Sequence, residues 1–307
     1  MALRDVAKRA VESAAVRSGL TARRLRSAVP SVVVLAYHNV VPAGEDPVGD
    51  LSLHVPQARF GEHLDLLVET HDVVSLDAAF SGGAQKEERP RAVITFDDAY
   101  RGTLTAGVEE LTRRGLPATV FVPPGLLGTD GFWWDLLAPG GGRTLDDELR
   151  ERALGTLGGM QDRILEWAAS QGLAPARLPD HARPVDIDEL RACAAATPGL
   201  TLGSHTWNHA NLAVLEPEAA RDEVVRGHAW LAESGVRTVD WLAYPYGIVP
   251  ESGTEWLADA VSGALLVEGG RAEVGGRPTS ERSAVPRLNV PSGLSTHGLH
   301  LRLAGLR

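Results

Sequence analysis

The sequence contains a single cysteine, Cys193, among its 307 residues. A lone cysteine excludes a disulfide bond within the chain and a zinc site built from cysteine thiolates. Residues 190–194, which surround it, have the composition of a helix. We therefore expect a buried thiol with a structural role.

Long apolar runs and a surplus of basic residues are also missing. No segment is apolar for long enough to span a bilayer, and no continuous apolar core follows the first basic residues, as a signal peptide requires. We expect a protein that is cytoplasmic or peripheral to the inner face of the membrane. The formal net charge of −10 argues against nucleic acid as a partner, and no internal repeat is present.

Residues 1–30 differ from the rest of the chain because basic residues outnumber acidic ones there. Val6, Ala10 and Ala14 give part of an apolar stripe, so this extension is predicted to form a basic amphipathic helix. Such a helix either makes peripheral contact with an anionic membrane, or it packs on the protein or stays solvated. Its basic residues are Arg4, Lys8, Arg9, Arg17, Arg23, Arg24 and Arg26.

The remainder, residues 31–307, has the composition of a globular domain. Hydrophobic residues make up 44% of the chain and charged residues 23%, which is ample for a core. Strand-like runs alternate with helix-like stretches, and this alternation predicts an α/β fold with a mostly parallel sheet. Strands are predicted at 31–40, 73–76, 92–96, 118–122, 200–203, 241–245 and 263–267, and helices at 57–70, 102–115, 184–197 and 216–234.

Two adjacent acids end one of these strands. Residues 92–96 are apolar or β-branched, as in a strand buried on both faces. Asp97 and Asp98 follow at its carboxyl end, where ligands bind in α/β folds. Neighbouring side chains on a strand point to opposite faces, so the two carboxylates can take different roles. The alternative is a turn, in which aspartate is common.

Two histidines follow another strand. His205 and His209 come after residues 200–203, and their spacing of four predicts that both imidazoles lie on one side of a helical turn. Two imidazoles and one carboxylate are enough protein ligands for a catalytic zinc ion, with one position open for water. The alternative is a pair of surface or cap residues.

Three ordered motifs make the chain resemble the polysaccharide deacetylases, the NodB-homology group of carbohydrate esterase family 4. Residues 95–100 (Thr-Phe-Asp-Asp-Ala-Tyr) resemble the first family motif, and residues 205–209 (His-Thr-Trp-Asn-His) fit the second. Residues 243–247 (Ala-Tyr-Pro-Tyr-Gly) resemble the third, and the similarity extends from about residue 31 to about 290. The resemblance implies a distorted, TIM-like (β/α)7 barrel in residues 31–307.

The resemblance also implies a reaction and a set of roles. A metal-dependent hydrolase would remove N-acetyl groups from an amino sugar or glycan and release acetate. Asp98, His205 and His209 would hold a divalent metal, with zinc favoured, and Asp97 would be the general base. The backbone N–H of Tyr246 would stabilise the oxyanion.

A Tyr37-His38 pair after the first strand resembles the poly-N-acetylglucosamine deacetylase branch of the family. In that branch an early histidine takes the general-acid role that a late histidine has in other members. We therefore expect His38 to protonate the leaving amine. His297 and His300, which lie near the end of the chain, are the competing residues.

Two departures from the family pattern stand out. Ala99 occupies a position where glycine is usual, which costs little if the backbone there has a negative φ. Ala243 replaces the arginine that usually pairs with the base. Arg287, in a run at 285–290 that also resembles the branch, is expected to take over this pairing. The alternatives are a surface arginine, with a base that is tuned differently or an enzyme of low activity.

Residues 128–185 interrupt the alternation and are predicted to be an insertion at the mouth of the barrel. Trp133 or Trp134 would either stack on a sugar ring or anchor the insertion in the core. Tyr37 and Tyr244 complete the expected substrate-binding residues. Two other functions remain open: deacetylation of a small or lipid-linked sugar intermediate, and carbohydrate binding without catalysis on the same fold.

Overall fold

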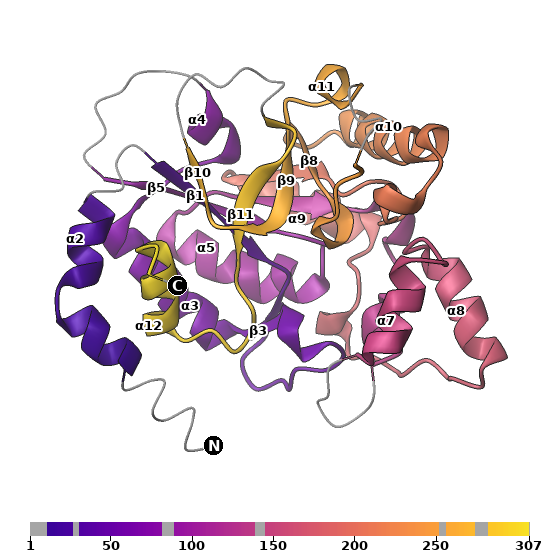
Figure 1. Ribbon diagram of the computed structural model, residues 1–307, viewed down its shortest axis with the longest axis horizontal. Helices are drawn as coiled ribbons and strands as arrows, with labels where there is room; N and C mark the ends of the chain where they lie inside the picture. Colours follow the sequence, from indigo (N-terminus) through magenta and orange to yellow (C-terminus); the bar gives the residue numbers. More distant parts are fainter. Residues whose placement is uncertain are drawn as a thin grey trace.

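Seven parallel strands close into a barrel in the computed structural model, which describes residues 11–26, 31–81, 89–138, 145–251, 256–273 and 282–306. The barrel closes because the first strand pairs in parallel with both the second and the last. The predicted (β/α)7 barrel is therefore confirmed (Figure 1). In order around the barrel its strands are β1 (Ser31–Tyr37), β5 (Arg91–Phe96), β6 (Ala118–Val122), β7 (Leu200–Ser204), β8 (Thr238–Ala243), β9 (Gly263–Gly269) and β11 (Val285–Asn289).

The register between β1 and β5 determines where the site forms. Both strands are apolar runs that are almost completely buried, as expected for parallel strands covered on both faces. Tyr37 pairs with Phe96 at their carboxyl ends, and the N–H of Asp97 donates to the carbonyl of Tyr37 at 3.0 Å. His38 and Asp97, the next residues of each strand, are therefore neighbours.

Short strands extend this sheet and form a second one. β10 (Arg271–Glu273) pairs antiparallel with β1, and β4 (Asp72–Val73) pairs with β5. The predicted strand at 31–40 is divided at His38, because β2 (Asn39–Val41) leaves the barrel and pairs with β3 (His54–Pro56). The predicted strand at 73–76 is wrong beyond its first residue, Val73. Ser75 accepts a hydrogen bond from the N–H of Ala78 and caps the helix that follows.

Helices cover the outside of the barrel (Figure 1). The predicted helix at 57–70 is confirmed, and its regularly spaced Phe60, Leu64 and Leu67 are completely buried. The predicted helix at 102–115 begins with a π-helical turn, η2 (Thr103–Gly107), and ends at Gly115 in the left-handed conformation (φ 64°). The covering helices are α3 (Gln57–Thr70), α4 (Leu76–Phe80), α5 (Val108–Arg114), α9 (Ile187–Ala196), α10 (Pro217–Glu233), α11 (Leu257–Ala260) and α12 (Thr296–Leu303).

The N-terminal extension packs against the C-terminal helix. Residues 11–17 and α2 (Leu20–Arg26) are helical and lie beside α12 (Figure 1). Glu12 is buried and accepts a hydrogen bond from the hydroxyl of Ser295 at 2.6 Å, and Leu25 joins the barrel core. The basic residues Arg4, Lys8, Arg9 lie outside the described residues. No helix in the described part of the chain has the length and apolar character that crossing a membrane requires.

The segment predicted as an insertion contains three helices, and the two that Figure 1 labels lie to one side of the barrel. The three helices are α6 (Trp133–Leu136), α7 (Asp147–Leu154) and α8 (Gln161–Ser170). Their apolar side chains form one cluster with Tyr100 and Tyr246, which belong to loops that follow β5 and β8. The segment is therefore packed directly on residues of the first and third motifs. The glycines at 140–142 lie outside the described residues.

Replacing Leu64 by alanine is expected to lower the free energy of unfolding by about 2–5 kcal/mol, because it leaves a cavity under α3. The matched change, Val68→Ala on the same helix, is expected to cost less than about 0.5 kcal/mol, since Val68 is 46% exposed. Urea unfolding of both variants measures the difference. Equal losses would contradict the placement of α3.

Candidate active site

The backbone of the three motifs is strained. The non-glycine residues with positive φ in the described part of the chain are Asp98 (72°), Ala99 (59°), Thr206 (62°), His209 (57°) and Tyr246 (59°). Each such conformation costs on the order of 1–3 kcal/mol and persists only where the surroundings fix it. All of them fall within the first, second and third motifs, so the strain is concentrated at one place.

Ala99 does not meet the condition under which an alanine costs little. Its φ is 59°, so the position that usually holds glycine does require the left-handed conformation, and the alanine carries the strain. Its methyl group is completely buried in the barrel core. Burial of this methyl group therefore offsets part of the backbone strain, which a glycine at this position would not have.

The two histidines come together without a helix. The prediction of a helical turn at 205–209 is wrong, because the chain there is irregular and Thr206 and His209 are left-handed. The imidazoles nevertheless meet one carboxylate: the Nε2 atoms of His205 and His209 lie 3.4 and 3.2 Å from Oδ1 of Asp98. The three ligand atoms lie within 4.8 Å of one another, and all three residues are buried.

This cluster fits a divalent metal. The ring nitrogen Nδ1 of His205 donates to the carbonyl of Ala243 at 2.8 Å, which directs Nε2 toward Asp98. Among the described residues, Oδ1 of Asp98 is buried and has no hydrogen-bond donor at normal geometry. A buried carboxylate oxygen between two imidazole nitrogens is a donor set that zinc prefers. The observed residues therefore suit a metal ion.

Charge interactions shift the pKa of each member of the cluster. Burial raises the pKa of Asp98, but the two imidazoles outweigh it and hold that pKa well below its usual range. Burial lowers the pKa of His205, but the carboxylates of Asp97 and Asp98 outweigh it, so the pKa is raised. Burial and the neighbouring His205 lower the pKa of His209. The opposite shifts of Asp98 and His205 both follow from their mutual attraction, and a bound dication would likewise favour the carboxylate form of Asp98.

Asp97 has a different partner. Its Oδ1 and Oδ2 accept hydrogen bonds from Nη1 and Nη2 of Arg287 at 2.8 and 2.7 Å, a two-pronged ion pair. Arg287 is completely buried, which contradicts the alternative of a surface arginine. The guanidinium also donates to Thr95 and to the carbonyl of Leu266. Burial raises the pKa of Asp97, but Arg287 outweighs it and keeps that pKa below its ordinary value.

His38 faces the same carboxylate from β1. Its Nε2 lies 4.0 Å from Oδ2 of Asp97, and its backbone carbonyl accepts a hydrogen bond from the hydroxyl of Thr103 at 2.6 Å. Burial lowers the pKa of His38 despite the nearby carboxylates, which favours the neutral imidazole. The competing His297 and His300 lie on α12 and do not border the site.

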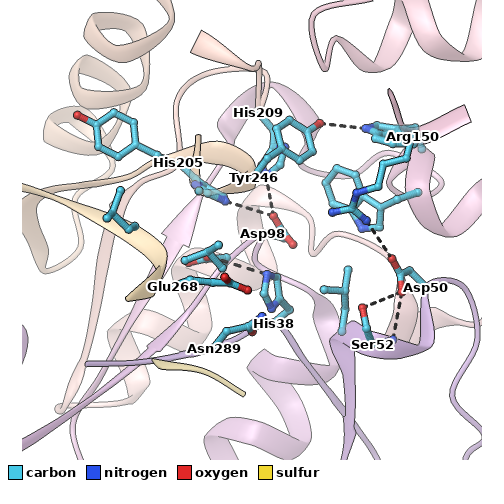
Figure 2. A pocket seen from close by; sticks show the side chains of 18 residues that line it. His38, Asp50, Ser52, Asp98, Arg150, His205, His209, Tyr246, Glu268 and Asn289 are labelled. Carbon is cyan, nitrogen blue, oxygen red and sulfur yellow. Dashed lines mark hydrogen bonds and ion pairs between the residues drawn. The ribbon is translucent and has the colours of Figure 1, made fainter. Parts of the chain in front are cut away.

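A cavity of about 410 Å³ opens onto both acids, both histidines of the second motif and His38. Figure 2 shows Asp98 between His205 and His209 on one side and His38 on the other. Five further polar residues border this cavity and were not predicted: Asp50, Ser52, Arg150, Glu268 and Asn289. Asp50 and Ser52 lie at the 3-10 turn before β3, Arg150 lies on α7, Glu268 lies near the end of β9 and Asn289 ends β11, so they reach the cavity from separate elements.

Trp133 and Trp134 border the cavity and are also anchored in the insertion. They are 2% and 5% exposed. The indole N–H of Trp133 donates to the hydroxyl of Tyr246 at 3.0 Å, and that of Trp134 donates to the hydroxyl of Tyr100 at 2.8 Å. The two indoles therefore do pack in the core, and their edges remain available to a ligand.

The predicted tyrosines differ in their position. Tyr244 borders the cavity, and its hydroxyl donates to the carbonyl of Ser283 at 2.9 Å. Tyr37 is completely buried and does not border the cavity, and its hydroxyl oxygen lies 3.3 Å from Nδ1 of His63. We therefore leave Tyr37 out of the substrate-binding residues.

A closed α/β barrel with an acid–arginine pair and an Asp-His-His cluster at the carboxyl ends of its strands defines the class of this protein. The chain belongs to the polysaccharide deacetylase family, whose sequence profile matches residues 84–260. No curated protein sequence matches the chain significantly.

Solved structures of bacterial deacetylases share the fold. The Streptococcus pyogenes deacetylase PplD, in complex with acetate, is 15% identical, with a TM-score of 0.59 over 89% of this chain and 98% of that one. IcaB from Ammonifex degensii is 17% identical, with a TM-score of 0.59 over 90% and 97%. The polysaccharide deacetylase BC0361 from Bacillus cereus is 15% identical, with a TM-score of 0.62 over 89% and 69%.

Replacing Arg287 by methionine is expected to lower the free energy of unfolding by about 3–5 kcal/mol at neutral pH, because it leaves the Asp97 carboxylate buried without a cation. In the wild type the low folded-state pKa of Asp97 means that the pair stabilises the fold at neutral pH and down through the acidic range to that pKa. In the variant, burial raises the pKa of Asp97 above its unfolded value. The deficit should therefore shrink as pH falls through this raised pKa.

Urea unfolding at neutral and mildly acidic pH measures this effect. The control is Arg59→Met, which removes an exposed pair with Glu62 at 3.3 Å and should cost at most about 1 kcal/mol. A deficit in R287M that does not change with pH would contradict the assignment.

Proposed function

We propose that this protein is a metal-dependent N-deacetylase that hydrolyses the acetamide of an N-acetylated amino sugar or glycan and releases acetate. One observation carries the proposal: the paired Asp97 and the Asp98-His205-His209 cluster face the same cavity. Membership of the polysaccharide deacetylase family supports it. Structural neighbours titled as deacetylases, one of them in complex with acetate, agree with this reaction.

Asp98, His205 and His209 would hold the metal, for which we favour zinc because of the mixed nitrogen and oxygen donors. When bound, such a metal acts as a Lewis acid toward a carbonyl oxygen and lowers the pKa of a coordinated water molecule. His209 and Asp98 are held in place by left-handed backbone, so the ligands are positioned before metal arrives.

Asp97 is the general base of the proposed mechanism. Its low pKa keeps it ionised at neutral pH, and Arg287 fixes the plane of its carboxylate. It accepts a proton from the attacking water while the new C–O bond forms at the acetamide carbon. The fully buried arginine thus orients the base and limits its basicity.

The oxyanion and the leaving amine need further groups. The backbone N–H of Tyr246, in a left-handed turn after β8, donates to the oxyanion in the family-based assignment. His38 protonates the amine nitrogen as the C–N bond breaks. Because burial favours neutral His38 in the free protein, we propose that the proton taken from water by Asp97 passes to His38, whose Nε2 lies 4.0 Å from that carboxylate, and from there to the amine nitrogen.

The substrate is an N-acetylated sugar, with Trp133, Trp134 and Tyr244 as the side chains that border its binding cavity. The volume of about 410 Å³ lies within the usual range of ligand pockets, roughly 300–1,000 Å³. The position of His38 after β1 is the feature that favours the poly-N-acetylglucosamine deacetylase branch, and IcaB from Ammonifex degensii has a similar fold. We therefore favour N-acetylglucosamine oligomers as the first substrates to test.

The wild-type protein, stripped of metal with a chelator, is expected to bind one equivalent of zinc. Asp98→Asn should weaken zinc binding by more than roughly 10- to 100-fold, which is the usual effect of losing a residue that only hydrogen-bonds to a metal ligand. The substitution removes the only charged ligand among the three proposed metal ligands. Competition with a fluorescent chelator measures the affinity. Asp222→Asn, which changes an aspartate that is 62% exposed, is the control and should bind zinc like the wild type. Unchanged affinity in D98N would remove Asp98 from the metal site.

Asp97→Asn is expected to keep zinc binding and to lower acetate release by about 10²–10⁴-fold, the usual contribution of a general base. Acetate is measured from N-acetylglucosamine oligomers, the monosaccharide and a lipid-linked N-acetyl sugar, with metal-stripped and zinc-restored protein. Undiminished turnover in D97N would exclude Asp97 as the base. If the zinc-loaded wild type binds sugar but releases no acetate from any substrate, carbohydrate binding without catalysis is the better description.

A further inference from the structure

The two histidines of the metal cluster are held in different ways. His205 is fixed by the hydrogen bond from its Nδ1 to the carbonyl of Ala243. The Nδ1 of His209 is buried and has no hydrogen-bond partner among the described residues. Metal-binding histidines usually donate their second ring nitrogen to such a partner, which fixes the ring orientation. Something other than a hydrogen bond must therefore orient His209.

Aromatic packing supplies that orientation. The centroid of the Trp134 ring lies 4.8 Å from that of the His209 ring. The centroid of the Tyr246 ring lies 4.5 Å from that of His209, and the planes of these two rings are 85° apart. The orientation of His209 thus depends on where the rings of Trp134 and Tyr246 are held. Trp134 comes from the insertion, so part of the metal site is positioned from outside the barrel motifs.

A chain of hydrogen bonds holds Trp134. Its indole N–H donates to the hydroxyl of Tyr100 at 2.8 Å, and that hydroxyl donates to Oδ2 of Asp135 at 2.6 Å. Tyr100 is completely buried, and Asp135 is 1% exposed. The hydroxyl has one proton to donate, so accepting from Trp134 and donating to Asp135 satisfies it in both directions.

Asp135 itself is fixed by two further donors. Its Oδ1 accepts from the backbone N–H of Asp50 at 2.8 Å and from Nε2 of His54 at 3.0 Å. The amide of Asn39 donates to Nδ1 of His54 at 3.0 Å, which places the ring proton on Nε2, toward Asp135. Asn39 directly follows His38. One buried carboxylate therefore connects the segment between β2 and β3, the start of β3 and the loop after β5 with the insertion.

Close packing of Gly49 keeps this carboxylate in place. Gly49 has a φ of 76°, and a Cβ atom at that position would lie 2.2 Å from Oδ1 of Asp135. The loop that carries Asp50 can therefore approach the carboxylate only because residue 49 is glycine. The network leaves little freedom for any of its members to shift.

We propose that Asp135 is a positioning residue that acts through Tyr100 and Trp134 to orient His209, and so determines how tightly the site holds its metal. The inference rests on the metal site of the proposed function. It assigns a role to a carboxylate that does not border the cavity and is not a metal ligand, and it gives the insertion a part in metal binding. The chain Asp135–Tyr100–Trp134–His209 is expected to act as a unit.

Tyr100→Phe tests this chain most directly, because it removes only the hydroxyl that joins Trp134 to Asp135. We expect its zinc dissociation constant to rise by about 10- to 100-fold, the usual effect of losing an outer-shell partner. Tyr37→Phe is the matched control. It also removes a completely buried hydroxyl beside an imidazole, that of His63, but it lies outside the chain and should leave zinc affinity unchanged.

Two further variants separate positioning from general stability. Asp135→Asn keeps the shape of the side chain, and combined with Tyr100→Phe it should weaken zinc binding no further than either change alone, since both break the same chain. Trp134→Phe keeps an aromatic ring against His209 but removes the N–H, and it should weaken zinc binding in the same direction. Urea unfolding of the metal-free proteins shows whether each variant is folded.

The results distinguish the inference from the proposed function. A wild-type protein that binds no zinc would overturn both. A wild type that binds zinc together with a Y100F variant of equal affinity would overturn the inference alone, whether or not Y100F is less stable. Weaker zinc binding by folded Y100F, and a changed visible absorption spectrum of its cobalt(II) form relative to Y37F, would establish it.

Discussion

The buried ion pair between Asp97 and Arg287 is the interaction on which the site depends. It joins the end of β5 to β11, the two strands that flank β1 in the barrel. Burying either charge alone would cost several kcal/mol, so each residue is tolerable only because the other is present. Two hydrogen bonds to the carboxylate, and others to Thr95 and Leu266, leave little freedom for the arginine to move. The third motif can therefore have an alanine at residue 243.

The pair also explains how two adjacent carboxylates serve different partners. Asp97 continues the line of β5 toward Arg287 and His38, whereas Asp98 is left-handed and turns toward the histidines. The strain at Asp98 is thus the means by which neighbouring residues face separate groups. Similar strain at His209 brings its ring beside that of His205, at 4.5 Å between ring centroids. Without helical geometry, the second motif depends on its surroundings for its shape.

Those surroundings are supplied in large part by the insertion. Trp134 packs on His209, Trp133 donates to Tyr246, and both belong to α6. His209 and Tyr246, two of the strained residues, are therefore contacted by side chains from a segment outside the barrel strands. This arrangement also couples the site to distant parts of the chain, because Asp135 accepts hydrogen bonds from Asp50 and His54.

The sequence by itself determined the barrel and the central residues of the site. Buried strands such as β1 and β5 are continuous apolar runs, and α3 has its apolar residues at helical spacing, so local patterns predict them. The motifs predicted that Asp97, Asp98, His205 and His209 would lie together at the strand ends, because parallel strands present their carboxyl ends at one edge. Arg287 was predicted as a partner of Asp97 because residues 285–290 resemble the same family branch and Ala243 replaces the usual arginine.

Only the tertiary structure decided the rest, because it depends on contacts between segments far apart in the chain. Left-handed backbone at Ala99 and Thr206 has no local signal, since the side chains of alanine and threonine disfavour it. The withdrawal of Tyr37 from the cavity follows from its packing beside His63, 26 residues away. Asp50, Arg150 and Glu268 reach the cavity from a loop, a helix of the insertion and a barrel strand, and Asp135 meets its three donors only when these distant segments are folded together. Local pattern therefore fixed the elements, and long-range packing fixed the geometry of the site.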